Sequence, residues 1–367
     1  MLLRLTIFRT LSLLVTCALV LGGCSRKPTA TGPKFQGRLL VLVRDWDLSA
    51  DLVELTPGSN EPTNQKIISS GMFETVPSPD EKQLLYSNGD GVFVRDLASG
   101  ADRKLAPATG GTNRCLAWAP DGNRISFRAS DSHEGSARAW LSVSDLNGKT
   151  KVIWESWVGG TSSDCDVHWI APDRLIFDRV LGVSAKQQKD GAVLLPNTTT
   201  MVTLKEPISS IDMEARWSIR GICPVGNAAV LTPQHKDGPI AMARDLNDLK
   251  TLNPLPVSCS VCKFAGFAAK SCVPFFLEMG EGKNTGVFSL DPVNWQRQRM
   301  ATIEQPLGMI SKSLVSSSAK LMVVGDGSSL FLVNTDSGEH SNLLPQKLAA
   351  SSGKKVIEVR PILWLEN

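Results

Sequence analysis

Short apolar segments alternate with polar turns along most of the chain, and their length is typical of β-strands. The segments mark a repeat, because they recur at intervals of 41 to 54 residues. They begin near Leu39, Leu84, Ile125, Leu175, Ala229, Phe275 and Leu321. A unit of about 40–50 residues is typical of one four-stranded propeller blade. No long segment has the 3.6-residue period of a helix, so the pattern predicts an all-β chain.

Two turn motifs recur at fixed places within these units. Pro presets φ at the first central position of a turn, and an Asp side chain caps the turn that follows. The first motif precedes the marked strand, as Ser78-Pro79-Asp80, Ala119-Pro120-Asp121-Gly122 and Ala171-Pro172-Asp173. The second lies between the third and fourth predicted strands, as Asp96-Leu97-Ala98-Ser99-Gly100, Asp145-Leu146-Asn147-Gly148, Asp245-Leu246-Asn247-Asp248 and Asn334-Thr335-Asp336-Ser337-Gly338.

Together these motifs resemble the TolB-type (WD40-like) β-propeller repeat, and residues 116–127 match it best. That repeat has a strand, a Ser-Pro-Asp-Gly turn, an apolar strand and then a strand that ends in Asp-x-x-x-Gly. The units near residues 175–215 and 217–305 depart from it, with Cys-rich and Pro-rich segments instead. The resemblance implies an extracytoplasmic binding scaffold rather than an enzyme.

The C-terminal segment 356–365 is apolar and β-type, yet no further unit follows it. The first unit, in turn, begins at Gly37 with what would be its second strand. A propeller must join its first and last blades or leave strand edges exposed. We therefore predict a single propeller domain over residues 37–367, with the terminal segment as the innermost strand of the first blade. Seven blades are favoured, and six or eight remain compatible with the weaker repeats.

The N-terminal residues show the pattern of a bacterial export signal. Arg4 and Arg9 precede an apolar run that is too short to span a membrane comfortably. The order Leu21-Gly22-Gly23-Cys24 resembles the bacterial lipobox, in which the Cys is acylated and becomes the first residue. We expect a signal peptide over residues 1–23, lipidation of Cys24 and a flexible tether over residues 24–36. An ordinary cleaved signal with an incidental Cys is the alternative. Ser25, a neutral residue directly after the Cys, resembles the signal that sorts bacterial lipoproteins to the outer membrane.

Composition narrows the class of partner. Loss of residues 1–23 removes Arg4 and Arg9 and lowers the net charge from +3 to +1. So small a net positive charge provides little electrostatic attraction for nucleic acid. A hydrophobic content of 42% excludes a disordered chain. We therefore expect a membrane contact through the lipid and an envelope protein, peptide or glycan as the partner.

Eight cysteines occur in the sequence, including Cys17 in the signal and Cys24 at the anchor. The remaining six are Cys115, Cys165, Cys223, Cys259, Cys262 and Cys272. An even number in an exported protein suggests disulfides, although the sequence alone does not choose the pairing. The Cys259-x-x-Cys262 pair also has the spacing of a redox motif or half a zinc site, but no second such pair exists. We favour structural disulfides and expect no bound metal.

One polar constellation is a candidate site. Asp164, Asp166 and His168 alternate with Cys165, Val167 and Trp169, so the three polar residues would share one face of a strand. On an innermost strand that face could look toward the central channel and hold a divalent cation. No fourth ligand is identifiable, so a solvated polar face is the competing interpretation.

The sequence offers little support for catalysis. It has no G-x-S-x-G motif and only four His, and the glycine-rich turns precede no helix. We therefore predict no enzyme activity and no cofactor. Tryptophans stand at repeated positions near the turns, at Trp118, Trp169, Trp217 and Trp364. They could stack on sugars or peptides in a channel, but packing between sheets is the interpretation we favour.

Three functions remain open at this stage. The chain could be a membrane-tethered scaffold that binds a protein or peptide, which the repeat architecture and anchor favour. It could instead bind or cleave glycans, which would need paired carboxylates across a Trp-lined funnel. It could also be a structural lipoprotein without a dedicated ligand. A fold alone does not choose among them.

Overall fold

The structure is a computed structural model of the 367-residue chain. The residues that it describes all lie in one compact unit, Pro33–Asn367. They are residues 33–34, 36–47, 49–58, 63–108, 114–133, 136–158, 167–179, 198–213, 217–223, 228–233, 241–243, 252–254, 262–268, 271–279, 284–291, 293–294, 296–303, 307, 310–344 and 350–366. The lipobox Cys24, residues 1–23 and most of the tether lie outside them.

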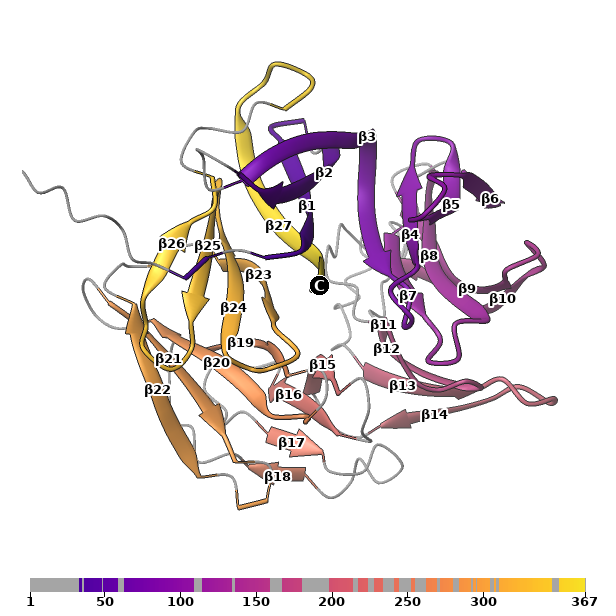
Figure 1. The fold of residues 1–367 in the computed structure, drawn as a ribbon. Coiled ribbons are helices and arrows are strands. Elements are labelled where there is room, and N and C mark those ends of the chain that lie inside the picture. Colours follow the sequence, from indigo (N-terminus) through magenta and orange to yellow (C-terminus); the bar gives the residue numbers. More distant parts are fainter. Residues whose placement is uncertain are drawn as a thin grey trace, which may run out of the picture. The chain divides into compact units, whose positions relative to one another are not determined.

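Every regular element among the described residues is a β-strand, and all strand pairs are antiparallel, as in β1 and β2 (Figure 1). The first sheet contains, in spatial order, β27 (Val356–Leu365), β1 (Arg38–Asp45), β2 (Ala50–Pro57), β3 (Thr63–Pro77), β4 (Gln83–Asn88), β5 (Gly91–Asp96) and β6 (Asp102–Pro107). The second contains β10 (Thr150–Val158), β9 (Ser136–Asp145), β8 (Arg124–His133) and β7 (Arg114–Trp118). The third contains β11 (Val167–Ala171), β12 (Arg174–Arg179), β13 (Thr198–Thr203) and β14 (Ser209–Met213).

Three further sheets have four strands each. The fourth contains β15 (Trp217–Ile222), β16 (Ala229–Pro233), β17 (Ala241–Ala243) and β18 (Leu252–Pro254). The fifth contains β19 (Cys262–Phe267), β20 (Pro274–Met279), β21 (Thr285–Leu290) and β22 (Arg297–Ile303). The sixth contains β23 (Ile310–Val315), β24 (Leu321–Asp326), β25 (Ser329–Asn334) and β26 (His340–Asn342).

Strand β3 divides the first sheet into two sets of four strands. Its first half pairs with β2 from Thr63 to Met72, and its second half pairs with β4 from Met72 to Pro77. Gly71 lies at the change of partner with φ of +76°, a conformation that favours glycine. Figure 1 shows β3 bending between its two halves. The sequence units predicted separate blades here but did not indicate that one long strand would join two of them.

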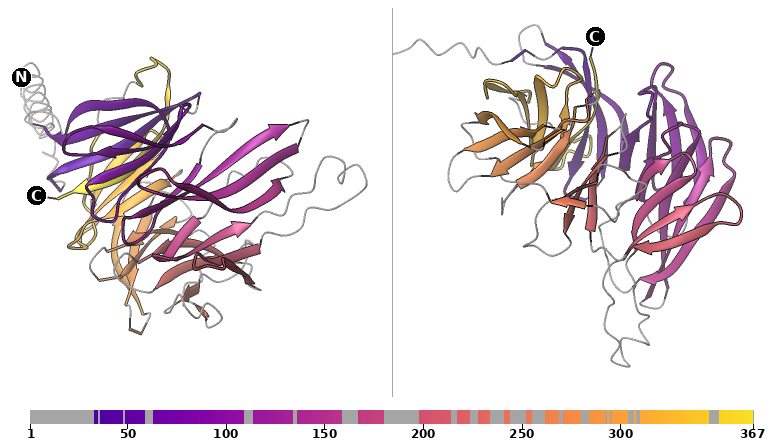
Figure 2. Two further views of the ribbon diagram at one scale, coloured as in Figure 1. Left: turned by 90° about the vertical axis from the view of Figure 1, so that its right-hand side faces the viewer. Right: turned by 90° about the horizontal axis from the view of Figure 1, so that it is seen from below.

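The C-terminal strand β27 pairs with β1 along almost its whole length, from Leu365 opposite Arg38 to Val356 opposite Asp45. A register shift occurs where Leu40 and Val41 face Leu363 and Pro361. Proline has no backbone N–H for the ladder, which is why a bulge accommodates it. Figure 2 shows the first and last strands side by side in two further views.

The strand sets pack against one another through apolar side chains. A cluster between the second half of the first sheet and the next sheet includes Leu85 and Phe127, both at most 2% exposed. Another joins the first strands to the last sheet and includes Val41 and Leu332. Each fully buried side chain of this size contributes about 1.5–3 kcal/mol of burial free energy. Apolar packing between successive sets therefore accounts for most of the core.

The two halves of the first sheet and the five other sheets are here called strand sets, each of four strands. One strand at the edge of each set contacts the corresponding strand of the next set. These strands, termed the inner strands, are β27, the second half of β3, β7, β11, β15, β19 and β23. The contacts run from β3 through β7 onward to β23, and β27 contacts both β23 and β3. Seven blades and a closed ring remain predictions, which this pairing supports and which a truncation can test.

The predicted turn motifs that fall within the described residues lie where the sequence pattern indicated, whereas Asp245-Leu246-Asn247-Asp248 lies outside them. Ser78 Oγ donates to the Asp80 carboxylate at 2.7 Å and accepts from the Gln83 amide at 2.9 Å, between β3 and β4. Between β5 and β6, the Asp96 carboxylate accepts from the Ser99 amide at 2.7 Å. Each acidic side chain satisfies turn donors, so the turn chemistry fixes where one strand ends and the next begins.

Candidate functional site

The predicted channel constellation is only partly described. His168 lies on β11 and is half-buried, and its Nε2 is 3.1 Å from the carbonyl oxygen of Ile219 on β15. The histidine therefore links two neighbouring inner strands. Asp164 and Asp166 lie outside the described residues, so the metal hypothesis for these three stays untested. Within the described part of the chain, no group of three or more His, Cys, Asp or Glu side chains is placed to hold a metal ion.

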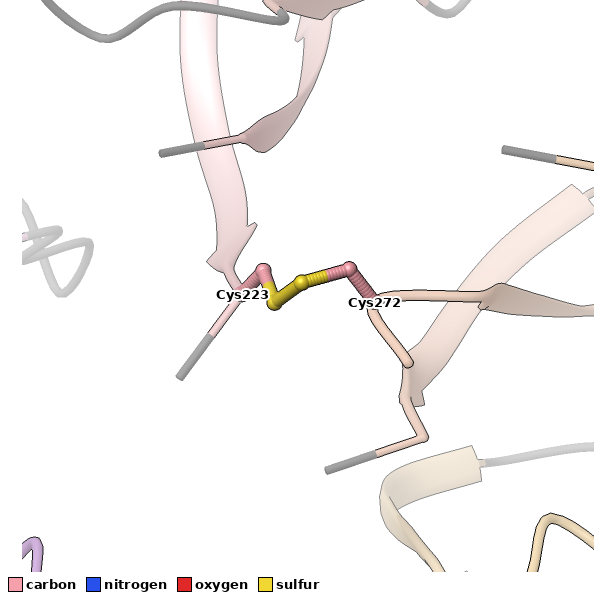
Figure 3. Close-up of a disulfide and its surroundings, with 2 residues drawn as sticks. All are labelled: Cys223 and Cys272. Carbon is pink, nitrogen blue, oxygen red and sulfur yellow. A yellow bond between two sulfur atoms is a disulfide. The ribbon is translucent and has the colours of Figure 1, made fainter. Parts of the chain in front are cut away.

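Cysteines join the fourth and fifth sheets. Cys223, just after β15, forms a disulfide with Cys272, just before β20, with Cα atoms 5.4 Å apart (Figure 3). The bond lies against an apolar cluster that includes Phe276. Cys115 and Cys262 are also disulfide-bonded. Cys165 and Cys259 lie outside the described residues.

Three of the repeated tryptophans are packed between strand sets. Trp118, Trp169 and Trp364 are at most 9% exposed and belong to three different apolar clusters. Their indole nitrogens donate to the Val76 carbonyl at 3.1 Å, the Ser126 hydroxyl at 3.0 Å and the Gln36 carbonyl at 3.0 Å, respectively. Since the rings are enclosed, these tryptophans serve packing rather than stacking on a ligand.

A group of charged side chains on and beside the inner strands is the stronger candidate site. Its five cations, termed the cationic cluster, are Arg44 (β1), Arg114 (β7), Arg128 (β8), Lys312 (β23) and Arg360 (β27). Two carboxylates accompany them, Glu74 on β3 and Glu358 on β27. The cluster is thus assembled from strands that lie far apart in the sequence.

Glu358 holds two of the cations. Its carboxylate lies 3.2 Å from Arg44 and 3.1 Å from Arg360. Arg44 also donates to the Phe73 carbonyl at 2.9 Å, while its Nε is buried without a hydrogen-bond partner among the described residues. Burial lowers the pKa of Arg44, and Arg360 and Arg114 lower it further, while Glu358 raises it. These effects place several like charges close to Arg44.

Glu74 is occupied by backbone donors. Its carboxylate accepts the Cys115 amide at 2.6 Å and is also hydrogen-bonded to the Leu116 amide. Burial raises the pKa of Glu74, although these amides and the charges of Arg360 and Lys312 act in the opposite direction. The carboxylate therefore fastens β3 to β7 and has limited capacity left to neutralise the cations around it.

Two further cations, Lys312 and Arg128, are partly buried and have no hydrogen bond or ion pair among the described residues. Burial lowers the pKa of Lys312 to about 8, and the charge of Arg360 lowers it further, against a raising effect of Glu74. Burial likewise lowers the pKa of Arg128, which lies opposite Arg114 in the strand register.

The cationic cluster was not predicted from the sequence. Its members come from five strands whose proximity only the fold creates. One signal was visible in the sequence: Glu74 and Lys312 are single charges inside otherwise uncharged segments that precede a turn. Such isolated charges on predicted inner strands could have been considered as candidate site residues.

The fold is that of a β-propeller. The chain is similar to the β-propeller domain of the Trilobed protease from Pyrococcus furiosus, with 14% identity and a TM-score of 0.51, covering 85% of this chain and 96% of that one. It is also similar to an acylaminoacyl peptidase from Pyrococcus horikoshii, with 11% identity and a TM-score of 0.53, covering 85% of this chain. This chain spans about half of that peptidase, 54% of its length. At these identities the likenesses define the fold alone.

A TolB from Acinetobacter baumannii is also similar, with 13% identity and a TM-score of 0.47, over 89% of this chain and 67% of that one. No protein-family model matches the sequence, and no curated protein matches it. The described residues contain no apolar helix long enough to cross a membrane.

Proposed function

We propose that this chain is an exported, lipid-anchored β-propeller that binds a protein or peptide partner through its inner strands. The observation that carries the proposal is the group of partly buried cations on and beside the inner strands. Arg44 and Arg360 share Glu358 there at 3.2 and 3.1 Å, and burial lowers the pKa of Lys312 and of Arg128. Desolvation of a charge is destabilising, and groups with pKa values perturbed in this way cluster at functional sites. A purely structural lipoprotein would gain nothing from keeping them.

The location rests on the N-terminal pattern. Leu21-Gly22-Gly23-Cys24 supports lipidation at Cys24, and Ser25 supports an outer-membrane address, with the propeller facing the periplasm or the cell surface. Several acyl chains would hold the protein firmly, since each buried CH₂ contributes about 0.8 kcal/mol. Binding near the membrane surface is therefore part of the proposal.

The glycan alternative receives less support from the described residues. Stacking on sugars needs open aromatic faces, yet Trp118, Trp169 and Trp364 are enclosed between strand sets. The two carboxylates of the charged group, Glu74 and Glu358, are held by backbone amides and by arginines. Neither is placed as a free acid or base for glycoside cleavage.

Photo-crosslinking in living cells tests the proposed function. The crosslinker replaces Lys263, an exposed residue on the inner strand β19 whose Nζ donates to the Ile310 carbonyl at 3.3 Å. The control replaces Arg103, an exposed residue on β6 at the far edge of its set. We expect a discrete adduct with one envelope polypeptide from the Lys263 position alone. Equal labelling from both positions, or adducts with glycan only, would refute a partner site on the inner strands.

A further inference from the structure

The chain enters the propeller at one end of strand β1, and specific contacts fix this entry point. The Pro33 carbonyl accepts a hydrogen bond from a serine hydroxyl on β26 at 3.0 Å. The Gln36 carbonyl accepts one from the Trp364 indole, also at 3.0 Å. Gly37 follows with φ of +81°, and a Cβ atom there would lie 2.1 Å from the Leu365 carbonyl oxygen. The chain therefore enters beside the C-terminal end of β27.

Turns of the last strand set lie at the same end of the strands. Glu366, just after β27, accepts a hydrogen bond from the Ser317 amide at 3.0 Å, in the turn between β23 and β24. Because neighbouring strands are antiparallel, the turn between β25 and β26 at Asp336 returns to this end. These strand ends, together with the entry point, are termed the tether face.

The ion pairs of the charged group lie at the opposite end of the same strands, which is termed the distal face. Arg44 is near the end of β1 and faces Glu358, near the start of β27. The Glu358 carboxylate lies 3.2 Å from Arg44 and 3.1 Å from Arg360. Arg44 also donates to the Phe73 carbonyl at 2.9 Å, so the second half of β3 starts at the distal face. Its strand set consequently has the β4–β5 turn at the distal face and the β5–β6 turn at the tether face.

The length of chain before the entry point limits how the propeller can meet a membrane. Cys24 precedes Pro33 by nine positions. A chain of nine residues reaches at most about 30 Å when fully extended. Strand β1 has 8 residues, so the distal face lies about 25 Å from the entry point along that strand. Placing the distal face against the bilayer would use most of this reach, whereas the tether face would need little of it.

We propose that a lipid at Cys24 holds the distal face away from the bilayer, so that Arg44, Glu358 and Arg360 meet a polypeptide that arrives from the aqueous side. The inference rests on the proposed function, and it adds the direction from which the partner approaches. A lipid surface as the ligand would need the opposite orientation. Charged side chains of both signs suit a polypeptide, whose own charges can be complementary to them.

Energy transfer from the protein to labelled lipid tests this orientation. The lipidated chain is purified and reconstituted into vesicles of phosphatidylethanolamine and phosphatidylglycerol that carry an acceptor dye on the headgroup. A fluorescent amino acid replaces Ala98, an exposed residue in the tether-face turn after β5, or Asp90, an exposed residue in the distal turn before it. Asp336 and Ser328, both exposed, form a second matched pair at the two ends of β25.

We expect transfer to be at least about twofold more efficient from the two tether-face positions than from the two distal positions. The physical reason is that a strand of 6 residues, about 20 Å long, separates the members of each pair. Two pairs in different strand sets distinguish this orientation from a propeller that lies on its side. Thermal unfolding confirms that each labelled protein is folded.

Equal transfer from the two faces would overturn the inference. Stronger transfer from the distal positions would also overturn it, and would assign lipid headgroups to the distal face. Either result from a lipidated chain, with the polypeptide adduct at Lys263 retained, would leave the proposed function standing. A chain that carries no lipid at Cys24 would refute the anchored form of the proposed function and this inference with it.

Discussion

Lys312 shows how one residue can reduce stability while it serves a site. Its ammonium group is half-buried and has no hydrogen bond or ion pair among the described residues, and burial and the charge of Arg360 lower its pKa against the opposing effect of Glu74. An unfolded chain would hydrate the same group fully, so folding opposes its charge. Functional sites commonly retain such groups, because stability is exchanged there for binding.

We predict that Lys312→Met stabilises the folded protein at neutral pH. The pKa falls from 10.5 in the unfolded chain to about 8 in the folded protein. Such a shift corresponds to about 3 kcal/mol, since one pKa unit is about 1.4 kcal/mol. Wild-type stability should therefore rise with pH above about 8, where the unfolded chain binds more protons, and the advantage of the variant should shrink there.

Urea denaturation at neutral and alkaline pH measures both effects. Lys66→Met is the control, because Lys66 is an exposed lysine on β3. The control should change the free energy of unfolding little at either pH. A Lys312→Met protein that is less stable than wild type at neutral pH would contradict the interpretation.

Glu74 should make the free energy of unfolding depend on pH in the opposite direction to Lys312. Burial raises its pKa above 4.5, so the folded protein binds the proton more tightly than the unfolded chain does. The contribution of this group to stability should fall as the pH rises from the unfolded pKa through the raised folded pKa. Glu74→Gln keeps an acceptor for the Cys115 amide and removes this slope. Denaturation across the acidic range should show that the free energy of unfolding of the variant rises relative to that of wild type as the pH increases. Parallel pH dependences of the two proteins would contradict this prediction.

At the scale of elements, much of the fold is accessible from the sequence. Turn chemistry at Ser78 and Asp96 is local, so the residues that cap each turn are adjacent in the chain and can be recognised there. The bend of β3 at Gly71 was missed, because nothing local distinguishes one long strand from two separate ones. The short strands β17 and β18 lie in the region where the repeat pattern is weakest.

Much less of the candidate site could be predicted from the sequence. Glu358, Arg44 and Arg360 interact because β27 pairs with β1, a contact between the two ends of the propeller domain. Lys312 and Glu74 are separated by many strands in sequence. Their mutual electrostatic effect depends on the packing of β23, β27 and β3. A single sequence indicates the charges, but only the tertiary arrangement shows which of them lack partners.

The disulfide between Cys223 and Cys272 makes a prediction at the element scale. It links residues 49 positions apart, so it restricts the unfolded chain and holds β15 near β20. Replacing both cysteines by Ser should lower the free energy of unfolding by about 2–4 kcal/mol under oxidising conditions. Denaturation of the double variant measures this loss.

Thiol counting on unfolded wild type should find most of the six cysteines oxidised, and five or six free thiols would rule the interpretation out.

For the molecule as a whole, attachment to the membrane depends on Cys24. We expect Cys24→Ala to release the chain from membranes or to leave it as unprocessed precursor. Membrane fractionation and mass spectrometry of the N-terminus measure the two outcomes. Finding wild type unmodified and free of the membrane would show that the lipobox interpretation is wrong.

The C-terminal strand β27 completes the first strand set and supplies Glu358 and Arg360 to the charged group. Thermal unfolding of the chain truncated after residue 355 is the most direct test of this role. The truncation exposes the edge of β1 and removes Val359 and Ile362 from the core. We predict that the truncated protein loses cooperative unfolding or fails to accumulate. A truncated protein that melts at the wild-type temperature with one sharp transition would contradict the account.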